Sequence, residues 1–196
     1  MSLKIVKYFK AKLNEYFCKK NISVQTSEKI FLIGFMGSGK TTIGKKLANK
    51  LNIPFFDVDE EVVNDEGKDI PAIFESNGEN YFRQKEHEKL TQLINKNEAF
   101  VISTGGGTPC FNNNMELMNT NGTTFYLKYT PEFLVSRLKN GIHKRPLLQN
   151  INLSELNSFI TSLLSEREFY YSQSHFTIEK INLKLDDFLT FFKTDL

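Results

Sequence analysis

The sequence predicts an α/β fold in which helices flank a central parallel sheet of about five strands. From residue 29 onward, short apolar runs of the kind buried in parallel sheets alternate with stretches of helical periodicity. Two of these runs end in glycine-rich segments, 34–39 and 105–107, and a third ends at Asp57. Since ligands of such folds bind beyond the carboxyl ends of the strands, we expect the functional site among these residues.

Each element is expected from its local pattern, in chain order. The strands are short apolar runs, and the helices carry apolar side chains three and four residues apart. Strands are expected over 30–33, 53–56, 99–103, 123–127 and 175–179. Helices are expected over 40–51, 70–74, 79–94, 131–138, 153–171 and 186–193, with a loop over 140–152.

The chain divides into an N-terminal basic amphipathic extension, 1–28, and one domain, 29–196. In the extension, Val6, Phe9, Leu13 and Phe17 recur at helical spacing among six lysines, which break up the apolar core that a secretory signal needs. The extension is interpreted either as a helix for a membrane surface or partner, or as an appended helix or partly disordered arm.

Composition excludes several classes of protein. The chain has 196 residues with 25 Lys and Arg against 23 Asp and Glu, a formal charge of +2 that argues against a dedicated nucleic-acid binder. Cys18 and Cys110 form no metal-type spacing and are too few for a disulfide scaffold, so we expect a reducing, cytoplasmic setting. No apolar run approaches the length of a transmembrane helix.

Residues 34–41 match the phosphate-binding motif G-x-x-x-x-G-K-[ST], for which a chance match has odds of about 1 in 100. Glycines let backbone N–H groups converge on phosphate oxygens, and the N-terminus of the following helix adds partial positive charge. We expect Lys40 to reach the β- and γ-phosphates and Thr41 to offer its hydroxyl to Mg²⁺. The alternative is a glycine-rich turn that binds no nucleotide.

Two carboxylates come after the second strand. Asp57 and Asp59 are two residues apart, so they share one face if the strand continues. Phosphoryl transfer requires one carboxylate near Mg²⁺ and another near the acceptor hydroxyl. The alternative role is capping of the helix that starts at Glu60, which is compatible with a site role for Asp59.

Two arginines continue apolar helix faces. Arg83 shares a face with Leu90 and Leu93, and Arg167 comes one turn after Leu163 and Leu164. An arginine directed at the core needs an anion to neutralise it, and Glu86 can hold Arg83 as an i, i+3 pair while leaving other donors for a ligand. The pair predicts an anionic acceptor, with a structural ion pair as the alternative.

Two further segments complete the predicted site. The glycines at 105–107 let a bare backbone approach a ligand closely, although a flexible turn is the simpler interpretation when they are taken alone. The loop over 140–152 is basic at its start, with His143, Lys144 and Arg145. A mobile basic loop that closes over phosphates excludes water, and Arg145 then stabilises charge on the transferring phosphoryl group.

Together these segments resemble the shikimate kinase family. The resemblance rests on six motifs in one order, GFMGSGKTTIGKKLA, FFDVDEEV, YFRQKE, STGGGT, KRPLL and REFYY, and covers residue 29 to the C-terminus. It implies a P-loop kinase fold with a mobile lid over about 140–152. It also implies Mg²⁺-dependent transfer of the γ-phosphoryl group of ATP to the 3-hydroxyl of shikimate, on the chorismate route to aromatic compounds.

The resemblance also implies a role for each matched residue, with Arg137 placed near adenine. The expected catalytic residues are Lys40, Asp59 and Arg145. ATP binding is expected at Gly37, Ser38, Gly39, Lys40, Thr41, Thr42, Arg137 and Arg145, and Mg²⁺ at Thr41 and, through water, Asp57. Shikimate binding is expected at Asp59, Arg83, Gly105, Gly106, Gly107 and Arg167. We expect a monomer with shikimate and ATP as partners, without nucleic acid or a membrane span.

Other classes fit less well. A gluconate-kinase-like enzyme shares the phosphate loop and lid but should lack the arginine pair and the glycine triplet. A guanine-nucleotide switch needs Asn-Lys-x-Asp, whereas residues 95–98 read Asn-Lys-Asn-Glu and precede a strand. An oligomeric ATPase motor carries its acidic pair on a later strand. A binding protein without catalysis is harder to separate, although every expected catalytic position is filled.

Overall fold

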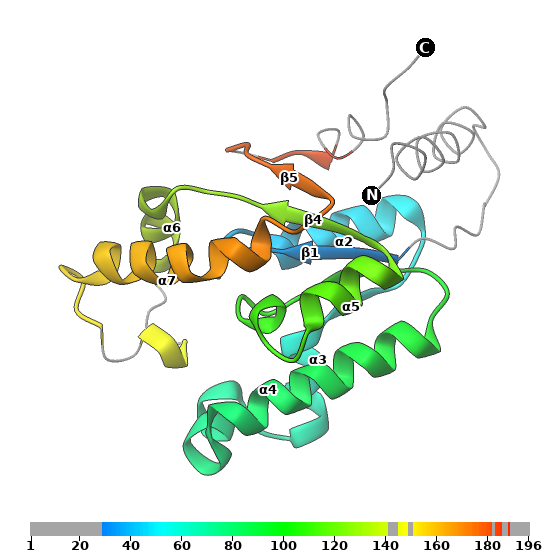
Figure 1. Ribbon diagram of the computed structural model, residues 1–196, viewed down its shortest axis with the longest axis horizontal. Helices are drawn as coiled ribbons and strands as arrows, with labels where there is room; N and C mark the ends of the chain where they lie inside the picture. The colour runs from blue at the N-terminus through cyan, green and yellow to red at the C-terminus, as the bar shows by residue number, and fades with distance from the viewer. Residues whose placement is uncertain (1–28, 141–144, 149–150, 182, 186–187, 189–196) are drawn as a thin grey trace.

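Figure 1 shows the computed structural model of the protein, which describes residues 29–140, 145–148, 151–181, 183–185 and 188. These residues form a five-stranded sheet in the order β2-β3-β1-β4-β5. The elements are β1 (Lys29–Ile33), α2 (Lys40–Leu51), β2 (Phe55–Asp57), α3 (Val58–Glu66), α4 (Ile70–Lys96), β3 (Phe100–Ser103), η1 (Thr108–Cys110), α5 (Asn114–Asn121), β4 (Thr123–Leu127), α6 (Pro131–Leu138), η3 (Pro146–Leu148), α7 (Leu156–Tyr171) and β5 (Phe176–Ile178).

All neighbouring strands of the sheet pair in parallel, which confirms the predicted fold class. β1 is central, and its Leu32 lies opposite Ser103 of β3 and Phe125 of β4. Its apolar side chains are buried on both faces, with Phe31 packed edge-to-face on Phe100 of β3 at 5.3 Å between ring centroids. Because the strands are parallel, the segments that come after β1, β2 and β3 meet at one edge of the sheet.

Helix α2 comes soon after β1 and packs on β1, β2 and β3. Gly44 allows this close approach, since a Cβ atom there would lie 2.6 Å from the ring of Phe55 and 3.0 Å from Leu32. Helix α5 lies against β4, the strand next to β1 on the side opposite to β3, and α6 packs with α7. The packing of α2 on the sheet places the start of this helix beside the ends of β2 and β3.

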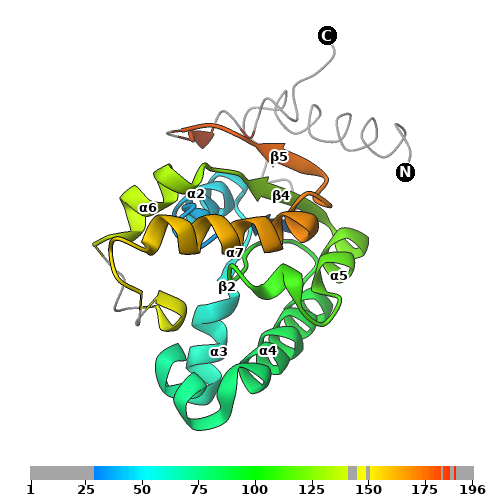
Figure 2. The ribbon, with the colours of Figure 1, turned by 60° about the vertical axis from the view of Figure 1, so that its left-hand side comes forward.

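Helices α3 and α4 lie side by side at the β2 end of the sheet, away from β5 (Figures 1 and 2). Asp57 caps α3 by accepting a hydrogen bond from the backbone N–H of Asp59, and Asp69 caps α4 through Ala72. Within α4, Gly78 leaves the helical conformation with φ of 82°. The helix therefore has a break between the two helical stretches expected from the sequence.

Several boundaries differ from the expected ones. The second strand is shifted to Phe55–Asp57, α7 begins at Leu156 rather than 153, and η3 forms inside the expected loop. Helix α3 corresponds to the helix considered from Glu60 as the alternative role of the aspartates, and it begins at Val58. Helix α5 and the turn η1 were not expected; in α5 only two methionines among eight residues are apolar and buried, which gives little periodicity. The extension 1–28 lies outside the described residues, as does most of the helix expected over 186–193. Among the described residues, no helix is long and apolar enough to cross a membrane.

Candidate active site

The loop between β1 and α2 is held in shape by Lys40. Its Nζ atom donates hydrogen bonds to the carbonyl oxygens of Gly34 at 2.8 Å and Phe35 at 3.0 Å. Burial lowers the pKa of Lys40 to about 8, although the nearby carboxylates of Asp59 and Asp57 work in the opposite direction. A buried cation beside the N-terminus of a twelve-residue helix forms a site suited to phosphate.

Thr41, Asp57 and Ser103 bring three side-chain oxygens together where α2 meets the ends of β2 and β3. The Thr41 hydroxyl donates to Asp57 Oδ2 at 2.7 Å and lies 3.4 Å from the Ser103 hydroxyl. The sequence predicted the first two as a magnesium site but did not find Ser103. Hydroxyl and carboxylate oxygens beside a phosphate loop suit Mg²⁺, which keeps several waters and few protein ligands. The described residues contain no group of three or more Asp, Glu, His or Cys that could hold a metal ion.

Three adjoining cavities open around this loop, and every site residue predicted from the sequence lines at least one of them. The first cavity, of about 380 Å³, contains Gly37, Gly39, Lys40, Thr41, Thr42, Asp57, Asp59, Gly105, Gly106, Arg137 and Arg145. The second, of about 280 Å³, contains Asp59, Arg83, Gly105, Gly106, Gly107, Arg145 and Arg167. The third, of about 250 Å³, contains Ser38, Gly39, Thr42 and Arg137. Asp59 and Arg145 line both the first and the second cavity.

Asp59 lies at the junction of the first and second cavities. Its Oδ1 atom is buried and has no hydrogen-bond partner among the described residues. Burial raises the pKa of Asp59 to about 8, and the charges of Glu86 and Asp57 act in the same direction. A carboxylate with a raised pKa and an unused oxygen is suited to accept a proton from a bound hydroxyl.

Arg83 is held from two sides on α4. Its Nη1 donates to Glu86 at 2.5 Å, as the spacing predicted, and its Nε and Nη2 donate to Glu79 at 3.1 and 2.8 Å. The guanidinium also stacks between Phe82 and Phe111, with 5.3 and 4.7 Å from Cζ to the ring centroids. Glu79 was not predicted from the sequence, although its i, i+4 spacing to Arg83 was visible.

Arg167 enters the second cavity from α7. Its side chain is buried, with the guanidinium Cζ 5.5 Å from the ring centroid of Phe35. Among the described residues, its buried Nη1 atom has no hydrogen-bond partner. Two arginines therefore face one cavity, and one of them has a donor available for an anion.

The glycine triplet forms the floor between these groups. A Cβ atom at Gly105 would lie 2.5 Å from Asp59 Oδ1, and one at Gly107 would lie 2.6 Å from Arg83 Cζ. None of the three glycines has a positive φ. The requirement for glycine at Gly105 and Gly107 is therefore space for the site residues rather than an unusual backbone conformation, which argues against a merely flexible turn.

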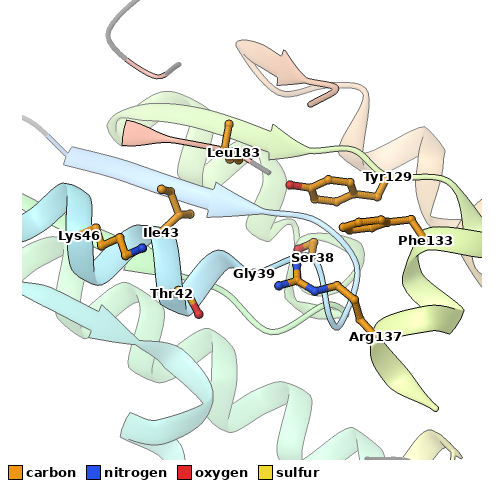
Figure 3. A pocket seen from close by; sticks show the side chains of 9 residues that line it. All are labelled: Ser38, Gly39, Thr42, Ile43, Lys46, Tyr129, Phe133, Arg137 and Leu183. Carbon is orange, nitrogen blue, oxygen red and sulfur yellow. The ribbon is translucent and has the colours of Figure 1, made fainter. Parts of the chain in front are cut away.

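The third cavity lies on the outer side of the phosphate loop (Figure 3). Arg137 extends across it from α6, with its guanidinium 5.4 Å from the ring centroid of Phe133. Phe133 in turn stacks on Tyr129 at 4.5 Å between centroids. Flat apolar walls and a guanidinium suit a planar base. The two aromatic residues were not predicted from the sequence, although Tyr129, Phe133 and Arg137 are spaced by four.

A parallel sheet whose central strand runs into a lysine-bearing phosphate loop is the architecture of P-loop nucleotide-binding proteins, and the adjoining pocket of carboxylate and arginines makes this one a kinase of a small anionic acceptor. Comparison with known families defines it further. The family model for shikimate kinase matches residues 36–192, and the chain belongs to the shikimate kinase family.

Individual relatives agree with this assignment. The chain is 50% identical over 157 residues to the shikimate kinase of Azobacteroides pseudotrichonymphae, covering 79% of this chain and 92% of the relative. It is 45% identical to the shikimate kinase of Flavobacterium psychrophilum, covering 77% of this chain and 88% of the relative. The solved shikimate kinase of Acinetobacter baumannii in complex with shikimate superposes with a TM-score of 0.75 at 35% identity, over 83% and 89%. The solved shikimate kinase of Bacteroides thetaiotaomicron superposes with a TM-score of 0.70 at 39% sequence identity, covering 78% of this chain and 85% of that chain.

Proposed function

We propose that this chain transfers the γ-phosphoryl group of ATP to the 3-hydroxyl of shikimate, yielding 3-phosphoshikimate and ADP for the biosynthesis of aromatic compounds. Within the shikimate kinase family, the observation that carries this proposal is the second cavity. There the buried, unpartnered Nη1 of Arg167 lies in the same pocket as Arg83 and Asp59. A ring acid with a carboxylate at one end and a hydroxyl at the other fits two arginines and one carboxylate.

In the reaction, the acceptor oxygen forms a bond to the γ-phosphorus, and the bond between that phosphorus and the β–γ bridging oxygen breaks, releasing ADP. The hydroxyl proton goes to Asp59, whose raised pKa matches this role. Lys40 and Arg145 stabilise the negative charge on the transferring group, because both line the first cavity together with Asp59.

Nucleotide binding involves the loop and the third cavity. We assign the triphosphate to Gly37, Ser38, Gly39, Lys40, Thr41 and Thr42, and the adenine to the pocket of Arg137. Magnesium, when bound, neutralises phosphate charge, and Thr41 and Asp57 would hold it, the latter through water. The oxygen cluster of Thr41, Asp57 and Ser103 supports this assignment.

The remaining assignments concern the rest of the chain. We propose that residues 140–152 form the lid that carries Arg145, and that 1–28 are an extension separate from the kinase domain 29–196. We also propose that the enzyme works as a monomer in the cytoplasm. Deleting residues 1–28 and measuring the native mass and the activity would test the separate extension and the monomeric state, with both measurements expected to be those of a monomeric, fully active domain.

An ADP-release assay with shikimate, gluconate and nucleoside monophosphates as acceptors tests the reaction itself. We expect release that depends on shikimate and is lost when magnesium is chelated. Folded protein that releases ADP only with another acceptor would overturn the proposed substrate. Activity that survives complete removal of divalent cations would overturn the assignment of Thr41 and Asp57.

A further inference from the structure

One contact joins the acceptor-binding helix α7 to the glycine triplet. The hydroxyl of Tyr171, four residues after Arg167, donates a hydrogen bond to the carbonyl oxygen of Gly106 at 2.5 Å. The two residues are 65 positions apart in sequence, and Tyr171 is fully buried at the end of α7. A buried hydroxyl with one defined acceptor fixes the orientation of the peptide unit that carries this acceptor.

The orientation of this peptide unit determines where the next N–H group points. All peptide bonds of the described residues are trans, so the carbonyl of Gly106 and the N–H of Gly107 point in opposite directions. With the carbonyl directed at Tyr171, the Gly107 N–H is directed away from it. Gly107 lines the second cavity with Arg83 and Arg167. Within the part of the chain that the structure describes, no backbone carbonyl accepts a hydrogen bond from this N–H.

We propose that Tyr171 is a positioning residue: it fixes the Gly106–Gly107 peptide so that the Gly107 N–H is presented to an oxygen of the bound acceptor, in register with Arg167 on the same helix. This inference rests on the proposed function, because the acceptor is the anion assigned to the second cavity. Gly106 lies close to both the phosphate loop and Arg167, since a Cβ there would lie 3.1 Å from the Met36 nitrogen and 3.2 Å from Arg167 Nη1. Because the Tyr171 hydroxyl holds the Gly106 carbonyl, loss of this contact leaves the direction of the Gly107 N–H less defined without removing any residue that touches the substrate.

The chain offers a matched control in Tyr126. It is also buried, its ring contacts that of Tyr171 at 5.0 Å between centroids, and its hydroxyl donates to Glu168 of α7 at 2.7 Å. Tyr126→Phe removes one hydrogen bond to α7, whereas Tyr171→Phe removes the hydrogen bond to Gly106 and the contact of the same hydroxyl with the Arg167 side chain. A difference between the variants therefore reports on the contacts of the Tyr171 hydroxyl rather than on helix stability, and the glycine contact among them is tested directly at the Gly107 amide.

The test is steady-state kinetics of both variants, with shikimate and ATP varied separately. For Tyr171→Phe we expect the KM for shikimate to rise about five- to tenfold, with kcat and the KM for ATP changed less than about twofold. For Tyr126→Phe all three constants should stay within about twofold of wild type. An equal rise in both variants would overturn the inference, as would a fall in kcat at unchanged KM. Wild-type protein without shikimate-dependent ADP release would instead refute the proposed function itself.

A measurement on the unaltered protein keeps the inference testable if Tyr171→Phe does not fold. With glycine labelled by nitrogen-15, a shikimate titration followed by NMR should shift the Gly107 amide resonance more than that of Gly122. The Gly122 N–H already donates to Met118 at the end of α5. A saturating titration that leaves the Gly107 amide in place would show that this N–H does not reach the acceptor, and the positioning role of Tyr171 would be wrong.

Discussion

Replacing Asp59 by Asn is expected to stabilise the folded protein increasingly as the pH rises. Burial, aided by Glu86 and Asp57, raises the pKa of Asp59 from 3.8 to about 8. The folded chain therefore keeps a proton over a pH range in which the unfolded chain has lost it. Stability from this group is complete below pH 4 and falls as the pH rises from about 4 to about 8, because deprotonation favours the unfolded chain. The asparagine side chain does not titrate, so the variant does not lose this stability as the pH rises.

The size of the effect is set by the two pKa values. Between pH 5.5 and pH 8, the titration of Asp59 costs the wild-type protein about 3 kcal/mol of unfolding free energy that the variant does not lose. For a chain of this length, that corresponds to a melting temperature gap that widens by about 6–12 °C over the same pH range.

Thermal unfolding of the two proteins at pH 5.5, 6.5, 7.5 and 8 measures this gap. Glu60→Gln is the control, because Glu60 lies one residue further on in α3 with a side chain that is 61% exposed. The difference in melting temperature between Glu60→Gln and wild type should stay small at every pH measured. The same Asp59→Asn protein should show no shikimate-dependent ADP release. A gap that is constant or narrows with rising pH would refute the reasoning from burial.

Three further substitutions test other parts of the site. Arg167→Lys should weaken shikimate binding about tenfold in a calorimetric titration, because an ammonium group cannot form the bidentate contact of a guanidinium; unchanged affinity would show that Arg167 only supports the fold. Lys40→Ala should lower kcat about a hundredfold or more whichever acceptor is phosphorylated, and a loss confined to one acceptor would contradict its role at the phosphates. Gly44→Ala should destabilise the fold by about 1–3 kcal/mol, since its Cβ would lie 2.6 Å from the Phe55 ring, and a wild-type melting temperature would be inconsistent with that packing.

Much of the site can be predicted from local patterns because a parallel sheet gathers distant strand ends at one edge. The phosphate loop after β1, Asp57 at the end of β2 and the glycines after β3 were all predicted from their position at the end of an apolar run. Helix spacing predicted the Arg83–Glu86 pair in the same way. Each of these predictions needed only a few consecutive residues and the rule that strand ends meet.

The features that the sequence did not reveal depend on packing over long distances. The contact between Tyr171 and Gly106 spans 65 residues and has no local signal. Helix α5 was missed because its Asn-rich sequence has only Met115 and Met118 to define a buried face. The pKa of Asp59 depends on Glu86, which comes from a different helix. Such features become visible only once the elements are placed together.

Because of Gly78, helix α4 lines the second cavity with two segments that have different directions. With φ of 82°, it breaks α4, so the segment that carries Ile70 and Phe74 does not continue the axis of the segment that carries Arg83. Nothing lies within 4 Å of a Cβ atom at this position, so a side chain would meet only the resistance of the backbone. The dihedral angles of one residue thus turn the apolar wall relative to the helical segment that carries the arginine, and the contact between Phe74 and Phe82, at 5.1 Å between ring centroids, joins the two walls.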